Sequence, residues 1–411
     1  MTLTTALPND AKSIRKPLAA LTCAFFLWGC LTSINSVLIP FFYHYFSLTY
    51  RDAMLVNVAF YLAPFVACLP CSALMARLGY RTTLMLAVGF AVMGCLLMAL
   101  AMWLVAFSLV LVAIFILAIG VAAMQVVANP YVTRLGPEAT AAGRLSLASA
   151  INSTGTTAAP LLVAGLLVLF PVSLATHQEP IRWLYVVLAG LACGLIGLLS
   201  LCRLPDFRQQ QMQRLTHTAK TLFREPHFVI GLLAIFTYVG VEVAIGTTAL
   251  SYLSDASLGN LDLQQATSLI AIYWGGSLVG RMLYGAVAHR VNAVSVFRIA
   301  TLSAGLLVIL AIFLGNRWGG FCLLLIGLMN SLMYPVIFSQ SVRNLGDKTS
   351  LASAFLIMAG IGGAVLPFLQ GWMMDAVGLR LSFLLPCAAY GVLMWVGLKM
   401  HQPLAVRPQA A

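Results

Sequence analysis

The sequence predicts an all-α membrane protein in which twelve transmembrane helices form two pseudo-symmetric halves of six. Of its 411 residues, 61% are hydrophobic and only 8% are charged, whereas a soluble domain carries about 25% charged residues. Apolar runs of the length that crosses a bilayer, about 20 residues, recur along the chain. Only helices and closed barrels satisfy every backbone group in lipid. Because the alternating segments of about ten residues that form barrels do not occur in the sequence, the spans are expected to be helical.

The apolar runs fall into two sets of six, separated by a polar and basic stretch at 204–227. This stretch is expected to link an N-terminal half, residues 1–203, to a C-terminal half, residues 228–411. The twelve spans are expected at 18–41, 53–76, 82–103, 106–131, 146–170, 182–203, 228–253, 265–289, 295–315, 318–342, 351–376 and 381–400.

The net charge of +12 is explained by membrane topology. With the N-terminus placed inside, one side of the membrane receives most of the basic residues, and the other side receives only Arg51, Arg182, Arg317 and Arg380. Cytoplasmic loops of membrane proteins are enriched in Lys and Arg, so both termini are predicted to be cytoplasmic. The partner indicated by this charge is membrane lipid, and no nucleic-acid partner is predicted.

Motifs of enzymes, metal sites and ATP-driven pumps are missing from the sequence. The nine cysteines and six histidines form no metal-ligand spacing. No Gly-rich phosphate loop with Lys and Ser/Thr occurs, which argues against ATP-driven transport within this chain. We therefore expect no enzymatic activity, no metal and no cofactor.

A five-residue run, SLASA, occurs at Ser146–Ala150 and again at Ser350–Ala354. Each copy follows a related proline motif, NPYV at 129–132 and YPVI at 334–337, and each leads into a Gly-rich apolar span. The two blocks lie between spans 4 and 5 and between spans 10 and 11, which are equivalent places in the two halves. Such repeats are typical of the major facilitator fold, in which substrate binds near the bilayer midplane between the halves. The small residues favour close packing at the start of the following helix.

Six stretches resemble the fucose:proton symporter family, and the nearest likeness is to its glucose/galactose branch. The resemblance implies a sugar permease of the bacterial inner membrane that imports a neutral monosaccharide, a hexose, by alternating access and with proton coupling. The stretches are FFLWGCLTSINSVLIP (25–40), QVVANPYVTRLGPE (125–138), RLSLASAINSTGTTAAP (144–160), YVGVEVAIG (238–246), YPVIFSQSVRNLG (334–346) and IGGAVLP (361–367).

The chain departs from the fucose permease pattern at both acidic positions associated with proton coupling. Ser36 stands where the pattern has an aspartate in span 1, and Gln125 stands where it has a glutamate in span 4, although the glucose branch also commonly has Gln at that position. Proton coupling therefore cannot be assigned to these two positions.

Glu242 is the one acidic residue placed well inside a predicted span, the seventh. A carboxylic acid near the centre of a membrane helix costs about 2.5–3.5 kcal/mol on insertion scales, so such residues are usually functional. We expect Glu242 to carry the coupling proton, to accept a sugar hydroxyl, or both. The alternative is a structural ion pair with Arg281 in span 8.

Further polar residues recur at helical spacing within the spans, where they share a helix face. Amides offer both donors and acceptors to a sugar, and a tryptophan can stack on the apolar face of a pyranose ring. The alternative for each is bonding between helices, and the Tyr334–Pro335 pair is also suited to bending span 10. The candidate substrate-binding residues are Trp28, Asn35, Gln125, Asn129, Ser149, Asn152, Glu242, Asn330 and Tyr334.

The sequence leaves several modes of transport open. A lone carboxylate without an oxygen-ligand cage favours protons over sodium as the coupling ion. The alternatives are a sodium-coupled symporter, an uncoupled facilitator, or an exporter of sugars or other small neutral solutes. A sugar sensor derived from a transporter is a different class, and the tail after residue 400, HQPLAVRPQAA, offers no signalling domain for it.

Overall fold

Helices form almost all of the computed structural model, which describes residues 11–135, 141–169, 178–202, 204, 221–287, 291–343, 345 and 348–400. Within these residues every regular element is helical. The N-terminal half contains α1 (Ala11–Tyr45), α2 (Tyr50–Ala53), α3 (Leu55–Leu78), α4 (Tyr80–Leu104), α5 (Phe107–Arg134), α6 (Ala141–Leu169) and α7 (Gln178–Leu201). The C-terminal half contains α9 (Pro226–Ser254), α10 (Leu263–Val287), α11 (Ala293–Leu314), α12 (Arg317–Asn330), α13 (Met333–Ser341), α14 (Thr349–Ala359), α15 (Gly362–Val377), α16 (Leu379–Ser382) and α17 (Leu384–Lys399).

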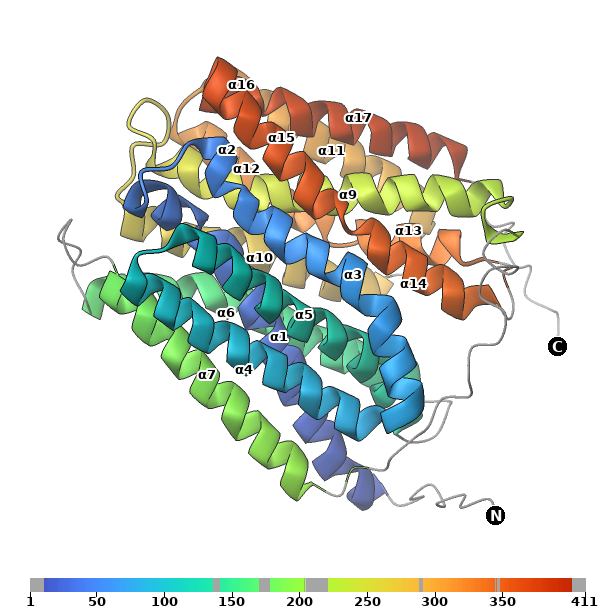
Figure 1. Ribbon diagram of the computed structural model, residues 1–411. Helices are drawn as coiled ribbons and strands as arrows, with labels where there is room; N and C mark the ends of the chain where they lie inside the picture. Colours follow the sequence, from blue (N-terminus) through green and yellow to red (C-terminus); the bar gives the residue numbers. More distant parts are fainter. Residues whose placement is uncertain are drawn as a thin grey trace, which may run out of the picture.

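These helices build twelve passes, because α2 leads into α3 and the pairs α12–α13, α14–α15 and α16–α17 each share one pass (Figure 1). The predicted spans agree with the observed passes to within a few residues at most of their ends. Helix α1 begins and α17 ends at one end of the bundle, which we call the terminal end (Figure 1). The opposite end, with α2 and α16, is called the distal end. Most of the predicted linker, 203 and 205–220, lies outside the described residues.

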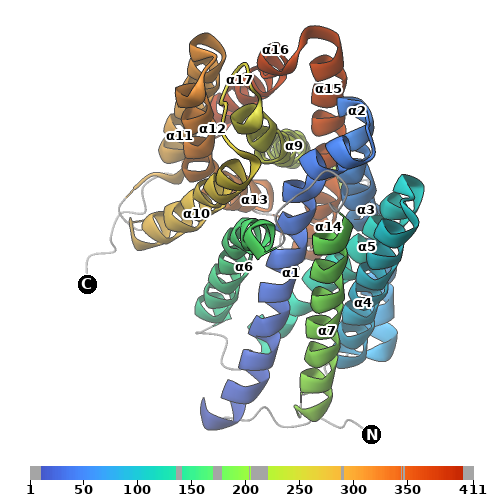
Figure 2. The same ribbon diagram turned by 90° about the vertical axis from the view of Figure 1, so that its left-hand side faces the viewer.

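Helices α6 and α10 form a contact between the two halves. Among the described helices, ten are long and apolar enough to cross a membrane, and α6 and α10 fall outside that set. These two helices pack against each other where the halves meet, as Figure 2 shows from the side. Gly275 of α10 lies against Thr157 of α6.

The repeat seen in the sequence corresponds to one packing arrangement that occurs in both halves. In the N-terminal half, a Cβ at Gly155 of α6 would lie 2.4 Å from the carbonyl oxygen of Phe26 in α1. In the C-terminal half, a Cβ at Gly362 of α15 would lie 1.8 Å from the carbonyl oxygen of Phe236 in α9. Each half thus packs its fifth span onto its first at a glycine that permits backbone contact, the behaviour of small residues in membrane helices.

The pseudo-symmetry does not extend to helix continuity. Spans 4 and 5 are the unbroken helices α5 and α6, although Pro130 and Pro160 lie inside them. Span 10 is interrupted between Asn330 and Met333, and span 11 is interrupted between Ala359 and Gly362. The expected bend near Tyr334 and Pro335 is therefore present as a break four residues before the proline.

Candidate functional site

Glu242 lies on α9 in contact with tyrosine hydroxyls. The Tyr238 hydroxyl, one helical turn earlier, donates to Glu242 Oε1 at 2.6 Å. The Tyr273 hydroxyl of α10 donates to the main-chain oxygen of Glu242 at 2.9 Å. Glu242 itself is half-buried. Its carboxylate is thus fixed by a short hydrogen bond of the charge-assisted kind, which is stronger than a neutral one.

Asn330, at the end of α12, connects this group to the last span. Its Nδ2 donates to the Tyr273 hydroxyl at 3.2 Å, and its Oδ1 accepts from the Tyr390 hydroxyl of α17 at 2.8 Å. Asn330 is fully buried, with 0% of its surface exposed. Three helices, α10, α12 and α17, are therefore joined to the turn that carries Glu242. In this arrangement Asn330 holds the network together, and its role as a sugar ligand remains a prediction.

Side chains contact two main-chain carbonyls at the break in span 10. Pro335 has no N–H, so the carbonyl four residues earlier, on Ser331, has no helical donor. Arg281 Nε reaches that oxygen at 3.4 Å. The Tyr238 hydroxyl lies 3.1 Å from the carbonyl oxygen of Asn330. Ser331 and Leu332 keep right-handed helical dihedral angles, so the break is a local disruption of the helix and the chain is not unwound there.

Arg281 also connects the two halves. Its Nη1 donates to Ser153 Oγ of α6 at 3.0 Å. No contact of 4.0 Å or less joins its guanidinium nitrogens to the Glu242 carboxylate, although the two groups lie close enough for their charges to interact. The ion pair considered as an alternative role for Glu242 is therefore not formed in this structure.

Two predicted amides of the N-terminal half serve as links between helices. Asn35 of α1 is buried, with its Oδ1 accepting from the Tyr185 hydroxyl at 2.8 Å and its Nδ2 donating to the Leu31 carbonyl at 2.7 Å. Asn152 of α6 donates through Nδ2 to the Phe25 carbonyl of α1 at 2.9 Å. Both side chains thus form hydrogen bonds within the protein, as expected if these residues bond between helices. Their contact with sugar remains a prediction.

The other candidates of the N-terminal half keep their polar atoms available. Gln125 and Asn129 lie one turn apart on α5, are half-buried, and make no side-chain hydrogen bond with any described residue. Ser149 is exposed on α6. Trp28 is half-buried on α1, and its ring lies 5.3 Å from that of Phe25. Free amides and a partly accessible indole are the groups that a sugar requires.

Several aromatic residues of the site escaped the sequence analysis. Tyr238 lies four residues before Glu242, a spacing that could have identified it, whereas Tyr273 and Tyr390 gave no local signal. Trp274 of α10 has a buried indole nitrogen without a hydrogen-bond partner among the described residues. Tyr61 of α3 and Tyr334 of α13 lie close enough to Glu242 to interact with its charge. The C-terminal half thus contributes most of a tyrosine-rich cluster, to which the N-terminal half adds Tyr61.

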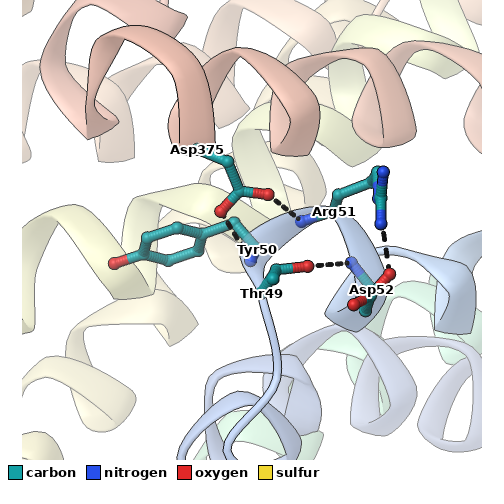
Figure 3. Close-up of polar contacts among 5 residues, drawn as sticks. All are labelled: Thr49, Tyr50, Arg51, Asp52 and Asp375. Carbon is teal, nitrogen blue, oxygen red and sulfur yellow. Dashed lines mark hydrogen bonds and ion pairs between the residues drawn. The ribbon is translucent and has the colours of Figure 1, made fainter.

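At the distal end the halves are joined by Asp375, the last-turn carboxylate of α15 (Figure 3). Its Oδ1 and Oδ2 accept the main-chain N–H groups of Tyr50 and Arg51, each at 2.9 Å. We call this contact the distal clasp. Nearby, Gly371 of α15 packs against Met54. The N–H groups at the start of a helix lack intrahelical partners, so a carboxylate from the other half satisfies two of them.

A sequence profile described as Major Facilitator Superfamily matches residues 20–356. The chain belongs to this superfamily. It is therefore a membrane transporter, and the resemblance to the fucose:proton symporter family is confirmed by its relatives. A glucose/galactose transporter of Brucella abortus is 34% identical over 392 residues, covering 95% of both chains. The L-fucose-proton symporter of Escherichia coli is 27% identical over 418 residues, covering 94% of both.

Solved structures of the superfamily share the fold of this transporter. The E. coli fucose:proton symporter, crystallised in an outward conformation, has a TM-score of 0.70 at 26% identity, covering 95% of this chain and all of that one. A bacterial homologue of the lysosomal transporter Spinster, in an inward-facing conformation, has a TM-score of 0.72 at 15% identity, covering 95% and 98%. The second likeness concerns the fold alone.

Proposed function

We propose that the chain is a proton-coupled sugar permease that imports a neutral hexose across the bacterial inner membrane by alternating access. The observation that carries this proposal is the half-buried Glu242 carboxylate, bonded to Tyr238 within a tyrosine-rich cluster where the two halves meet. The relatives named above, a glucose/galactose transporter and an L-fucose-proton symporter, support a sugar substrate, and the second also supports a proton as the coupling ion.

The polar groups left free around the junction match the chemistry of a sugar. Gln125 and Asn129 offer amide donors and acceptors on one face of α5, and the Trp274 indole nitrogen offers a donor without a protein partner. Trp28 and the cluster tyrosines offer ring faces for the apolar side of a pyranose.

Glu242 is the candidate proton carrier, because the two acidic positions of the fucose permease pattern are Ser36 and Gln125 in this chain. A carboxylate inside a spanning helix is expensive and usually functional. Protonation removes its charge, which changes what its neighbours can bond. By linkage, sugar binding must then alter proton affinity as much as protonation alters sugar affinity.

The proposed orientation places the terminal end in the cytoplasm and the distal end in the periplasm. It rests on the excess of Lys and Arg near the terminal end. In this orientation the distal clasp closes the periplasmic side in the conformation described. Residues 1–203 and 228–411 are then two halves that rock against each other, joined by a cytoplasmic linker at 204–227.

The test is sugar uptake into proteoliposomes containing the wild-type protein or Glu242→Gln. A proton gradient directed into the vesicles, with the outside more acidic, should drive accumulation of radiolabelled glucose or galactose in the wild type. A protonophore should abolish this accumulation. Glu242→Gln, which keeps the shape of the protonated acid, should retain counterflow exchange and lose accumulation. A sodium gradient alone should have no effect.

Other outcomes would select the alternatives. Equilibration without accumulation under any gradient would indicate an uncoupled facilitator, and accumulation driven by sodium alone would indicate a sodium symporter. Normal proton-driven accumulation by Glu242→Gln would remove Glu242 as the coupling group. Binding of sugar without any flux would indicate a sensor.

A further inference from the structure

The Tyr238 hydroxyl contacts both the Glu242 carboxylate and the broken helix of span 10, so a change in the protonation of Glu242 can affect that helix. Its hydroxyl oxygen lies 2.6 Å from Glu242 Oε1 and 3.1 Å from the carbonyl oxygen of Asn330. A tyrosine hydroxyl carries one proton. It can therefore donate fully to only one of these two acceptors at a time, so the two contacts are alternatives.

The charge of Glu242 decides between the two acceptors. An ionised carboxylate only accepts, and a bond to a charged acceptor is about twice as strong as a neutral one, so the Tyr238 hydroxyl donates to Glu242. A protonated Glu242 has an O–H of its own, which can donate to the Tyr238 oxygen. The Tyr238 hydroxyl is then released to donate to Asn330. One proton is added to Glu242, and Tyr238 keeps its own.

The Asn330 carbonyl is a site where such a change matters. Helix α12 ends at Asn330 and α13 begins at Met333, and the Tyr238 hydroxyl is the side-chain donor that contacts the Asn330 carbonyl oxygen at this break. Asn330 is fully buried, and an unsatisfied buried carbonyl is costly. Protonation of Glu242 therefore stabilises the broken conformation of span 10 seen in this structure, because the Tyr238 hydroxyl then donates to the Asn330 carbonyl. Ionisation of Glu242 draws that hydroxyl to the carboxylate and removes this bond.

The other groups around Glu242 lack this double contact. Tyr61 from α3, Tyr334 from α13 and Tyr390 from α17 interact with its charge, as do Tyr273 and Arg281 from α10. Tyr273 donates to the main chain of Glu242, and Arg281 reaches the break at Ser331 without contacting the carboxylate. Among the described residues, Tyr238 alone bonds both the carboxylate and the break.

We propose that Tyr238 is a positioning residue that transmits the protonation of Glu242 to span 10 by moving its hydroxyl from the Glu242 carboxylate to the Asn330 carbonyl. This inference rests on the proposed proton role of Glu242 and adds the route by which the proton changes the C-terminal half. A proton can drive transport only if its binding favours one conformation over another. The hydrogen bond from Tyr238 to Asn330, formed when Glu242 is protonated, provides the difference in free energy between the two conformations.

The test compares Tyr238→Phe with Tyr252→Phe, a matched loss of one buried hydroxyl from the same helix, whose own hydrogen bond goes to the Ala311 carbonyl. Difference infrared spectroscopy between two pH values follows the carboxyl C=O band of protonated Glu242, assigned by its loss in Glu242→Gln. Proteoliposomes measure counterflow and pH-driven accumulation of radiolabelled galactose. Tyr238→Phe should keep the Glu242 band and counterflow but lose accumulation. Tyr252→Phe should keep all three.

Accumulation at the wild-type level by Tyr238→Phe would overturn the inference, and so would equal loss in Tyr252→Phe. Failure of the proposed function looks different, because either the Glu242 band would be missing from the wild type or Glu242→Gln would accumulate sugar. If Tyr238→Phe is not recovered from membranes, wild-type protein with ring-deuterated tyrosine replaces it. Its tyrosine bands should shift when Glu242 is protonated and stay constant in Glu242→Gln, and unchanged bands in the wild type would overturn the inference.

Discussion

Removing the distal clasp should shift the transporter toward conformations in which the distal end is open. The clasp consists of two hydrogen bonds of 2.9 Å from the N–H groups of Tyr50 and Arg51 to Asp375. Asp375 is exposed, so the value for buried charged bonds, about 1.5–3 kcal/mol, must be reduced for screening to about 0.5–1 kcal/mol each. These bonds join different halves, so their loss changes the equilibrium between conformations.

Asp375→Ala removes both bonds, about 1–2 kcal/mol, which corresponds to a shift of about 5–30-fold because about 1.4 kcal/mol is tenfold. Asp375→Asn keeps one carbonyl oxygen as an acceptor, so we expect a shift of about 2–5-fold. Asp52→Asn is the matched control. Asp52 is a neighbouring acid whose side chain pairs with Arg51 within its own half, and its removal should leave the equilibrium unchanged.

The assay is double electron–electron resonance, which measures the distance between two spin labels. The labels are attached at Leu104→Cys on α4 and Leu381→Cys on α16, with the native cysteines replaced. Both positions are exposed, at 53% and 46%, and lie at the distal ends of different halves. The population at longer distance should grow in the order wild type, Asp375→Asn, Asp375→Ala. Identical distance distributions in the wild type and Asp375→Ala would refute the reasoning, as would an equal change in Asp52→Asn.

Two further predictions test the site and the helix packing. Gln125→Ala should weaken sugar binding about tenfold with an unchanged melting temperature, since its amide makes no hydrogen bond with a described residue. Asn152→Ala should weaken binding and also lower the melting temperature, because it removes the hydrogen bond from its amide to the Phe25 carbonyl of α1, worth about 0.5–1.5 kcal/mol. Isothermal titration and thermal unfolding in detergent measure both effects, and unchanged isotherms would remove the residue from the site. Gly362→Ala should destabilise the fold by about 1–3 kcal/mol or more through overpacking, whereas Gly89→Ala, with nothing within 4 Å, should not; equal melting temperatures would contradict the close packing of α9 and α15.

Much of the fold was predictable because the lipid environment acts on each segment separately. A span is recognised by its own hydropathy and length, and the predicted spans therefore agree with the helices of the structure within a few residues. The paired SLASA blocks predicted equivalent halves, and the close contacts at Gly155 and Gly362 give that repeat a structural role. Glu242 could be singled out because an acid inside a span is costly wherever it occurs.

The tertiary structure alone decided which polar groups meet. Asn35 and Asn152 carry the amide groups expected of sugar ligands, yet these amides form hydrogen bonds to Tyr185 and Phe25 of other helices. In the sequence, Asp375 is an acidic residue at the end of a span. Only the tertiary structure shows that it contacts the start of α2. Helix rotation and tilt, set by packing across the whole bundle, fix these contacts, and a segment's own hydropathy does not encode them. The sequence by itself therefore determined the spans, the repeat and the exceptional carboxylate, whereas the network around Glu242 and the clasp between the halves were decided by tertiary packing.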